Sequence, residues 1–413
     1  MVLVFNVASS VDSLVVGERQ ILSQLREAYE FARTQGLCGD ALRLLMDQAV
    51  LTSKEVFSTT RIGEKPVSVA SLAVLKLLRY ALRPDARILL VGAGGVGDAI
   101  VKIAASRDFY DIIVVSDYDF SRAEKSIEWV RNKYGADKAS KFLAAKIDAS
   151  SAANVAELAK NHNITHVLNA VEPKFVPTVF SGAFTAGANY VDMAMSLSEA
   201  HETDPFHKPG IKLGDSQYAV SEQWERAGKL ALVGMGVEPG MSNVFARYAA
   251  DNLFSEIDEI SVKDGGSLAV FDDEGNEIFA PSFSIWTTIE ECLNPPVIYE
   301  RNRGWFTTEP FSEPEIFEFP EGIGSVECVN VEHEEVTMLP RHLNANRVTF
   351  KYGLGSEFIG VLKTLHKLGL DATRPTRVRS NQGPVDVSPR DMVAAVLPDP
   401  AHIGPKMTGK TCA

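Results

Sequence analysis

The chain has 413 residues, which is too long for one ordinary hydrophobic core and predicts two or three domains. Hydrophobic residues make up 45% and charged residues 23%, a balance typical of folded globular proteins that argues against disorder. The formal net charge of -13 argues against sequence-independent binding of nucleic acid, because neutralising phosphates requires clustered lysines and arginines.

Cysteine usage and hydropathy indicate the compartment. The four cysteines are widely scattered and lack paired metal-ligand spacing, which predicts reduced thiols and no structural metal: Cys38, Cys292, Cys328 and Cys412. No run reaches the roughly 18 uncharged apolar residues of a membrane helix. The amino-terminal stretch lacks a basic segment and carries Asp12 and Glu18, so it does not resemble a secretion signal. We therefore expect a cytoplasmic protein without a membrane partner.

The amino-terminal part is predicted to be helical. Apolar residues recur at helical spacing over 22–32, and a second such pattern covers 41–49 after the break at Gly36 and Gly39. We predict a separate helical segment over 1–82.

From Arg87 onward the period changes to short aliphatic runs that alternate with helical stretches. The first two runs are ARILLVGAGG and YDIIVVSD, and each ends in turn residues, as buried parallel strands do. Further strand candidates follow at 142–148, 165–171, 189–195 and 230–236. This alternation predicts an α/β fold with a Rossmann-type parallel sheet over 83–240.

Beyond this sheet, apolar and polar residues alternate along shorter segments. The stretches IDEISVKDGG, SVECVNVEHEEVTML and NRVTFKYG are typical of antiparallel strands with one solvated face. We predict a second α+β domain over 241–413 with helices on one side of the sheet, which serves for substrate binding or dimerisation. A homodimer is the default expectation.

A glycine-rich motif follows the first predicted strand and opens a predicted helix. It consists of Gly92, Gly94, Gly95, Val96 and Gly97 around Ala93. The first glycine permits a tight turn, Gly94 lets the backbone approach a pyrophosphate, and Gly97 lets the helix pack closely on the strand. Free amides at the helix N-terminus then face the phosphate charge, so the motif predicts dinucleotide binding.

Two carboxylates after the next strands bear on the choice of cofactor. Asp117 ends the second strand about 20 residues after the motif, where a carboxylate binds the ribose hydroxyls and repels a 2′-phosphate. This favours NAD, although Arg122 leaves NADP open. Asp148, after the third strand, either reaches the adenine or caps the following helix.

An ordered series of motifs resembles the saccharopine dehydrogenase family over about 87–371. After VGAGGVG come VLNAVEP at 167–173, AGANYVDMA at 186–194 and GMGVEPGMSN at 234–243. The resemblance implies that Asn169, Ala170 and Pro173 lie at the cofactor and that Asp192 lies at the reacting centre. Asp192 stands at the carboxyl end of a predicted parallel strand, where open α/β sheets keep ligands, although a carboxylate there could also act only as a cap.

The chemistry that the resemblance implies is hydride transfer at a C–N bond through an imine. The substrate amine must be neutral to release hydride, so a nearby group has to accept its proton. Asp192 is the first candidate, and Glu290 and His333 are weaker ones. In this family the chain normally continues past the point where the present sequence ends, so we expect a truncated carboxyl end.

An amino-acid substrate also requires a cation for its carboxylate, usually arginine. Saccharopine reductases carry one shortly after a tryptophan, but here the corresponding segment, 286–290, reads WTTIE. The small-molecule substrate can thus be lysine-like or polyamine-like, as for lysine 6-dehydrogenase or carboxynorspermidine synthase. Arg341 and Arg347 are candidate substitutes for the missing arginine, and Glu290 is a candidate substrate contact.

A second resemblance covers residues 7–74, where VASSVDSLVVGERQILSQLREAYEFA and VSVASLAV are similar to glutamyl-tRNA reductase. That enzyme acts through a cysteine in a segment that should lie upstream of this sequence, so we interpret 1–82 as a remnant or fusion, with an artefactual gene model as an equal alternative. A tetrapyrrole-route reductase and a non-catalytic dinucleotide-binding protein remain as alternatives. The Walker A pattern at 404–411 is rejected, because neither a preceding strand nor a following helix is predicted there.

Overall fold

The computed structural model describes residues 2–9, 19–60, 85–280, 284–381, 383–398 and 407–412. The chain divides into two compact units, Met1–Asp85 and Ala86–Ala413. Within the described ranges, no helix combines the length and the apolar character that crossing a bilayer would require.

The first unit is helical, as predicted. It contains α1 (Val2–Ala8), α2 (Arg19–Thr34) and α3 (Asp40–Thr59). Helix α3 buries Met46, Ala49 and Ser53, and the Ser53 hydroxyl donates a hydrogen bond to the carbonyl of Ala8 at 2.7 Å. The remainder of the predicted helical segment, 61–82, lies outside the described residues.

The second unit begins with a six-stranded parallel sheet in the order β3-β2-β1-β4-β5-β6. Its strands are β1 (Arg87–Val91), β2 (Ile112–Asp117), β3 (Phe142–Lys146), β4 (His166–Asn169), β5 (Asn189–Asp192) and β6 (Ala231–Leu232). Strands β1 to β3 form one half of the sheet and strands β4 to β6 the other. The strand order reverses between β1 and β4, which pair in parallel. Open sheets of this kind bind ligands at the carboxyl ends of the strands beside that switch point.

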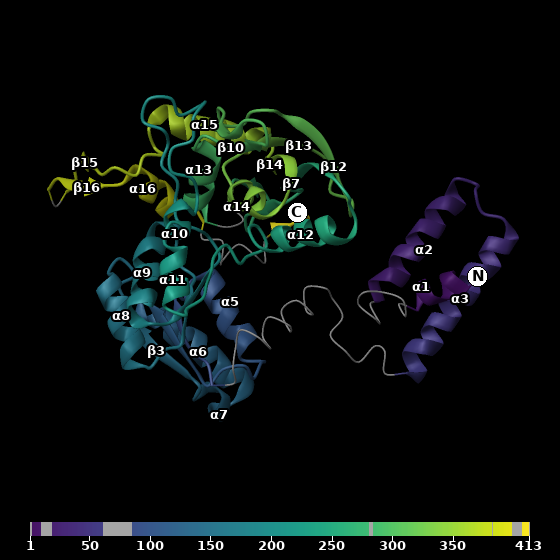
Figure 1. Cartoon of the computed structure of the whole chain (residues 1–413), viewed down its shortest axis with the longest axis horizontal. Helices are drawn as coiled ribbons and strands as arrows, with labels where there is room; N and C mark the ends of the chain where they lie inside the picture. The colour runs from purple at the N-terminus through teal and green to yellow at the C-terminus, as the bar shows by residue number, and fades with distance from the viewer. Residues whose placement is uncertain are drawn as a thin grey trace. The chain divides into compact units, whose positions relative to one another are not determined.

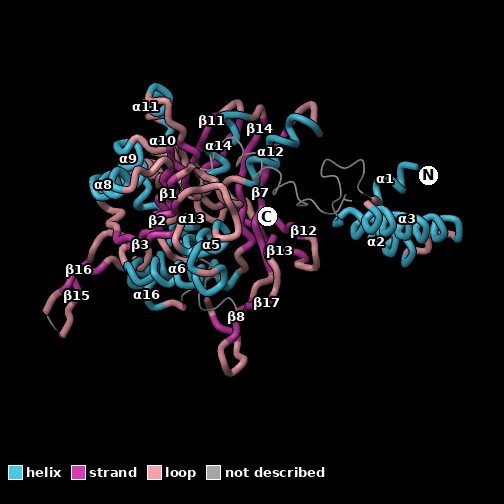
Figure 2. Tube along the Cα trace, turned by 90° about the horizontal axis from the view of Figure 1, so that it is seen from below, coloured by secondary structure: helices cyan, strands magenta, loops and turns pink. Residues whose placement is uncertain are grey.

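Helices cover both faces of the parallel sheet (Figure 2). Helices α5 (Gly95–Ala104) and α6 (Phe120–Tyr134) lie on one side, and α8 (Ala152–Asn161) and α9 (Val176–Ala186) on the other. The shorter helices are α7 (Ala136–Ala139), the 3-10 helix η2 (Pro173–Phe175), α10 (Asp215–Tyr218) and α11 (Ser221–Arg226). Leu89, Val114 and Val167 lie in the core between the layers, as the aliphatic strand runs predicted.

The rest of the second unit forms a β-rich lobe, drawn in green in Figure 1. Its main sheet contains β7 (Ile257–Gly266), β10 (Val297–Glu300), β11 (Gly304–Thr307), β12 (Glu315–Phe319), β13 (Gly324–Asn330), β14 (Ala345–Gly353) and β18 (Thr411–Cys412). Most pairs are antiparallel, as predicted, but β7 pairs with β14 in parallel, so the sheet is mixed.

Helices and small sheets complete the lobe. The helices are α12 (Met241–Asn252), α13 (Ile285–Leu293), α14 (Glu334–His342), α15 (Ser356–Leu368) and α16 (Pro389–Val396). The small sheets contain β8 (Ala269–Phe271), β9 (Glu277–Ile278), β15 (Thr376–Val378), β16 (Val385–Val387) and β17 (Met407–Thr408). In the Walker-like segment, the described residues form β17 and β18 rather than a helix.

Helix α14 joins the lobe to the ends of the parallel strands. The Met195 amide, just after β5, donates to Glu334 Oε1 at 3.1 Å, and the Thr337 hydroxyl donates to the carbonyl of Leu213 at 3.1 Å. The first turn of α14 therefore lies over the carboxyl ends of β5 and β6.

Candidate active site

The glycine-rich loop has the geometry of a dinucleotide cradle. Gly92 has φ +99°, and a Cβ there would lie 2.7 Å from the carbonyl oxygen of Ala170. A Cβ at Gly97 would collide with the carbonyl of Gly92. In contrast, Cβ atoms at Gly94 and Gly95 would meet nothing within 4 Å, so open space remains where a pyrophosphate would approach. The residues present thus fit the cofactor.

Helix α5 begins directly after this loop, with Gly94 as its N-cap. Its first-turn amides lack the intrahelical carbonyl partners that later amides have, and the helix dipole adds partial positive charge there. Val96 in this turn is 55% exposed, which keeps the turn open to a ligand.

We expect Gly94→Val to weaken binding of both NAD and NADP by at least about 100-fold, because the new side chain fills the space of the pyrophosphate. Gly94 has φ −73°, so valine adds no backbone strain and the fold should survive. Isothermal titration calorimetry measures the affinity, with Gly360→Ala in α15 as a control, because a Cβ there meets nothing within 4 Å. Unchanged affinity in a folded Gly94→Val protein would remove the loop from the binding site.

Asp117 at the end of β2 is fixed by the glycine loop. Its Oδ2 accepts from the Ala93 amide at 2.8 Å and its Oδ1 from the Asp119 amide at 2.9 Å. The carboxylate therefore lies beside the loop, and each oxygen retains a further lone pair for a ribose hydroxyl. Arg122 lies in the first turn of α6, close in sequence.

Asp148 closes a local turn before α8. Its Oδ1 accepts from the Ser150 amide at 3.0 Å and from the Ser150 hydroxyl at 2.6 Å, while Ser151 caps the helix. Ser151 rather than Asp148 therefore caps α8, and binding of adenine by Asp148 stays a prediction.

The strands β4 and β5 bring three polar side chains together. Asn169 and Asp192 are register partners at the ends of these strands. The Asn169 amide donates to the Tyr190 hydroxyl at 2.9 Å, and that hydroxyl hydrogen-bonds to Asp192. Beyond β4, Ala170 donates its amide to the carbonyl of Val91 at 2.8 Å, and Pro173 begins η2. The motif residues from 169 to 173 thus run past the glycine loop.

Asp192 is a buried carboxylate with an altered acidity. It is 1% exposed, its Oδ1 accepts from the Gly234 amide at 2.7 Å, and its Oδ2 accepts from Gln217 Nε2 at 2.7 Å. Burial raises the pKa of Asp192 to about 7, although these hydrogen bonds oppose the rise. A carboxyl group with this pKa can exchange a proton at neutral pH.

Next to Asp192, the β-rich lobe holds a group of buried and half-buried titratable residues that we call the acidic cluster. It consists of Glu238, Asp264, Glu291, Glu332, His333, Glu334 and Glu335. His333 Nδ1 lies 2.5 Å from Glu335 Oε2 and 3.5 Å from Glu334 Oε2. Glu334 is also among the charges that raise the pKa of Asp192. The cluster therefore continues from the ends of the parallel strands into the lobe.

The cluster contains more carboxylates than it can ionise. Burial raises the pKa of Glu291 to about 8 and that of Glu332 to about 7. Burial and the charge of Asp264 raise the pKa of Glu238 to about 8. The buried Oε2 of Glu291 has no hydrogen-bond partner in the described part of the chain. A cation entering this region would stabilise carboxylates that are otherwise held protonated.

His333 is the one basic group of the cluster. Burial alone would lower its pKa, but the charges of Glu335, Glu334 and Glu291 raise the pKa to about 10. Ligand atoms of His333, Glu334 and Glu335 lie within 4.8 Å of one another, a spacing that a metal could bridge. However, a protonated imidazole has no free lone pair for a metal. The expected absence of a metal site stays a prediction.

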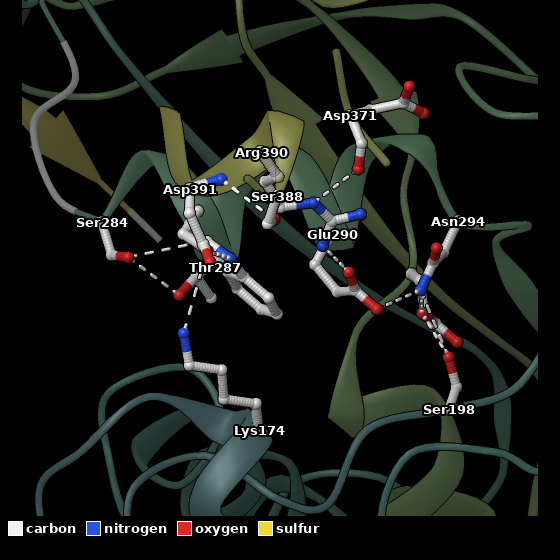
Figure 3. Close-up of polar contacts among 12 residues, drawn as sticks. Lys174, Ser198, Ser284, Thr287, Glu290, Asn294, Asp371, Ser388, Arg390 and Asp391 are labelled. Carbon is white, nitrogen blue, oxygen red and sulfur yellow. Dashed lines mark hydrogen bonds and ion pairs between the residues drawn. The ribbon is translucent and has the colours of Figure 1, made fainter. Parts of the chain in front are cut away.

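The candidate substrate residues lie at separate places. Arg341 Nη2 pairs with Asp215 Oδ1 at 2.8 Å, and Arg347 binds Glu300 and Glu313 at 2.5 and 2.6 Å. Glu290 on α13 instead lies beside the acidic cluster, because Asn294 Nδ2 donates to Glu290 Oε1 at 3.0 Å and to Glu332 Oε2 at 2.9 Å (Figure 3).

Several residues at this junction were missed by sequence reasoning. Gln217 and Arg390 stand in segments without a recognisable motif, and only the fold brings them to the site. The acidic run at 332–335 could have indicated a functional site, because it interrupts an apolar pattern directly after a predicted strand. Only His333 was singled out there.

The strand order and the glycine loop define a dinucleotide-binding α/β protein with a second lobe over its strand ends. Residues 88–232 match the family model for the saccharopine dehydrogenase NADP binding domain, and residues 236–411 match the one for the saccharopine dehydrogenase C-terminal domain. This chain belongs to the saccharopine dehydrogenase family of NAD(P)-binding oxidoreductases, which confirms the resemblance found in the sequence.

Curated relatives align with most of the chain. Carboxynorspermidine synthase of Vibrio alginolyticus is 29% identical over 327 residues, covering 79% of this chain and 76% of the relative. Carboxyaminopropylagmatine dehydrogenase of Synechocystis is 25% identical over 332 residues, with the same coverage of both chains.

The amino-terminal unit has a different relationship. Residues 2–60 match the family model for the N-terminal domain of glutamyl-tRNA reductase, as the sequence predicted. The glutamyl-tRNA reductase of Campylobacter jejuni is 37% identical over 126 residues, which is 30% of this chain and 28% of that enzyme.

Proposed function

We propose that residues 86–412 catalyse NAD(P)-dependent hydride transfer at the C–N bond of a carboxylated amine of the carboxynorspermidine type. The observation that carries this proposal is Asp192, a carboxylate with a pKa of about 7 that is buried at the end of β5 beside the acidic cluster. Two relatives whose names denote enzymes of carboxylated amines support it.

The cofactor would be held by the residues that the sequence motifs single out. The loop amides around Gly94, Gly95 and Val96 would bind the pyrophosphate, and Gly92 and Gly97 would allow the turn. Asp117 would bind the adenosine ribose, which favours NAD over NADP through repulsion of a 2′-phosphate. Asn169, Ala170 and Pro173 would lie along the nicotinamide side.

Asp192 would serve as the proton acceptor for amine oxidation. It would remove one proton from the substrate ammonium, which leaves a neutral amine with a free electron pair. The bound nicotinamide accepts the hydride from the adjacent carbon, and the amine electron pair forms the C=N bond. In the reductive direction, Asp192 would return the proton to the amine product.

The acidic cluster would bind the cationic amine groups of the substrate. The segment after Trp286 lacks the arginine that the resemblance implies for saccharopine, so a cation for its carboxylate would have to come from elsewhere in the chain. A lysine-like substrate carries a shorter cationic chain and remains the second candidate. We also propose that 83–240 and 241–413 act as separate domains within a homodimer.

We do not assign glutamyl-tRNA reductase activity to the amino-terminal unit. Its similarity covers 28% of that relative, and Cys38 donates to the Tyr29 carbonyl at 3.8 Å, with no hydrogen bond to an activating base among the residues described in this unit.

Oxidation assays with the full chain test the proposed function. We expect NAD(P)H to form when carboxynorspermidine is offered with NAD or NADP, and more slowly or not at all with saccharopine and lysine. Cofactor binding without turnover of any of these amines would instead favour a non-catalytic dinucleotide-binding protein.

A further inference from the structure

The structure places one arginine where the sequence lacks the expected cation. Arg390 in the first turn of α16 pairs through Nη1 with Glu290 Oε2, and its Nε donates to the Asp371 carbonyl at 2.7 Å (Figure 3). Its Cζ lies 4.7 Å from the ring centroid of Trp286 on α13. A residue about 100 positions downstream thus supplies a guanidinium to this place.

The guanidinium is rigid and largely buried, with its side chain 8% exposed. Two of its nitrogens donate to Glu290 and to the carbonyl of Asp371, and one face of the guanidinium lies near the ring of Trp286. Its third nitrogen, Nη2, makes no hydrogen bond to any described residue. An oriented arginine with free donors in a dehydrated setting is suited to bind a carboxylate.

The surroundings connect Arg390 to both halves of the proposed site. Lys174, which follows Pro173 at the proposed nicotinamide side, places Nζ 5.1 Å from the ring centroid of Trp286 and 3.9 Å from Asp391 Oδ1. On the other side, Asn294 links Glu290 to Glu332 of the acidic cluster.

Helix α13 separates two kinds of charge. Trp286 and Glu290 are four residues apart and share the face towards Arg390, whereas Glu291 interacts with the charges of the acidic cluster. A substrate that carries an ammonium group and a carboxylate could therefore meet opposite charges on either side of one helix.

We propose that Arg390 binds the carboxylate of the amine substrate through Nη2, while Glu290 holds the guanidinium in place. This assignment rests on the proposed function. It predicts that the enzyme distinguishes a carboxylate from a neutral carboxamide of the same shape at that position.

The test measures kcat/KM of the full chain for carboxynorspermidine and for its carboxamide derivative. We expect the wild type to prefer the carboxylate by at least about tenfold, the effect of one charge-assisted hydrogen bond. Arg390→Met should abolish this preference by raising KM for the carboxylate. Because that variant leaves Glu290 buried and unpaired, the double variant Glu290→Gln/Arg390→Met removes both charges and should show the same loss.

The matched control is Arg377→Met, which removes an exposed arginine paired with Asp386 at 3.0 Å on the β15–β16 hairpin and should retain the preference. Equal use of both compounds by the wild type, or retained preference in the folded double variant, would overturn the role of Arg390 while leaving the proposed function intact. Failure of the wild type to oxidise either compound would overturn the proposed function, and the assignment with it.

Discussion

Asp192→Asn is expected to lower kcat for amine oxidation by about 10² to 10⁴-fold, the usual contribution of a positioned proton acceptor. In the wild type, kcat/KM should rise as the pH increases through about 7, because only the ionised carboxylate accepts a proton and its pKa in the free protein is about 7. The variant should lose this limb of the profile. Stopped-flow measurement of NAD(P)H formation across the pH range follows both effects.

In the wild type, Gln217 donates to Asp192 through Nε2, and its Oε1 already accepts from the Ser196 amide at 2.8 Å. The side-chain amide of the Asp192→Asn variant would therefore face Gln217 without a free acceptor, so this variant needs a folding control. Cofactor affinity and the thermal midpoint therefore accompany the rates. Asp258→Asn removes an exposed carboxylate that accepts from Asn346 at 3.0 Å, and it should leave kcat unchanged. A folded Asp192→Asn protein with wild-type kcat would exclude Asp192 as the acceptor.

The ligand-free protein should lose stability as the pH rises from about 5 to 8.5. In the folded state the pKa values of Glu238, Glu291 and Glu332 are raised to about 8, 8 and 7. Over this range the folded state binds protons that the unfolded state has released. The free energy of unfolding therefore falls by up to about 1.4 kcal/mol per pH unit for each retained proton.

His333 acts in the same direction, since its raised pKa of about 10 contributes stability that is lost as the pH passes that value. Glu291→Gln should make the free energy of unfolding less dependent on pH, and it should stabilise the protein mostly above pH 8. The control Glu327→Gln, at an exposed position, should leave the pH dependence unchanged. A diamine should raise the thermal midpoint more at high pH than at low pH. A midpoint independent of pH in wild type and variant alike would contradict the charge state of the cluster.

The parallel sheet was predictable from the sequence because its determinants are local. Aliphatic strands such as Arg87–Val91 are buried on both faces, and Gly92 and Gly97 are required by the turn and by close packing. The placement of Asp192 followed from the same logic, since parallel strands end at a common edge. Helices α2 and α3 of the amino-terminal unit followed from their apolar spacing.

The substrate side was less predictable because long-range packing decides it. The carboxylate with which an arginine pairs is often far away in sequence, as Arg341 with Asp215 and Arg390 with Glu290 show. The parallel pairing of β7 with β14 likewise has no local signature, because each strand alternates as an antiparallel strand would.

The most direct measurement uses carboxynorspermidine deuterated at the carbon that donates the hydride. After turnover by the full chain, proton NMR of the recovered cofactor should show deuterium at C4 of the reduced nicotinamide, on one face only. The Asp192→Asn protein should give far less of this product. Intact deuterated amine and unlabelled cofactor, from a protein that binds both ligands, would contradict hydride transfer at this site.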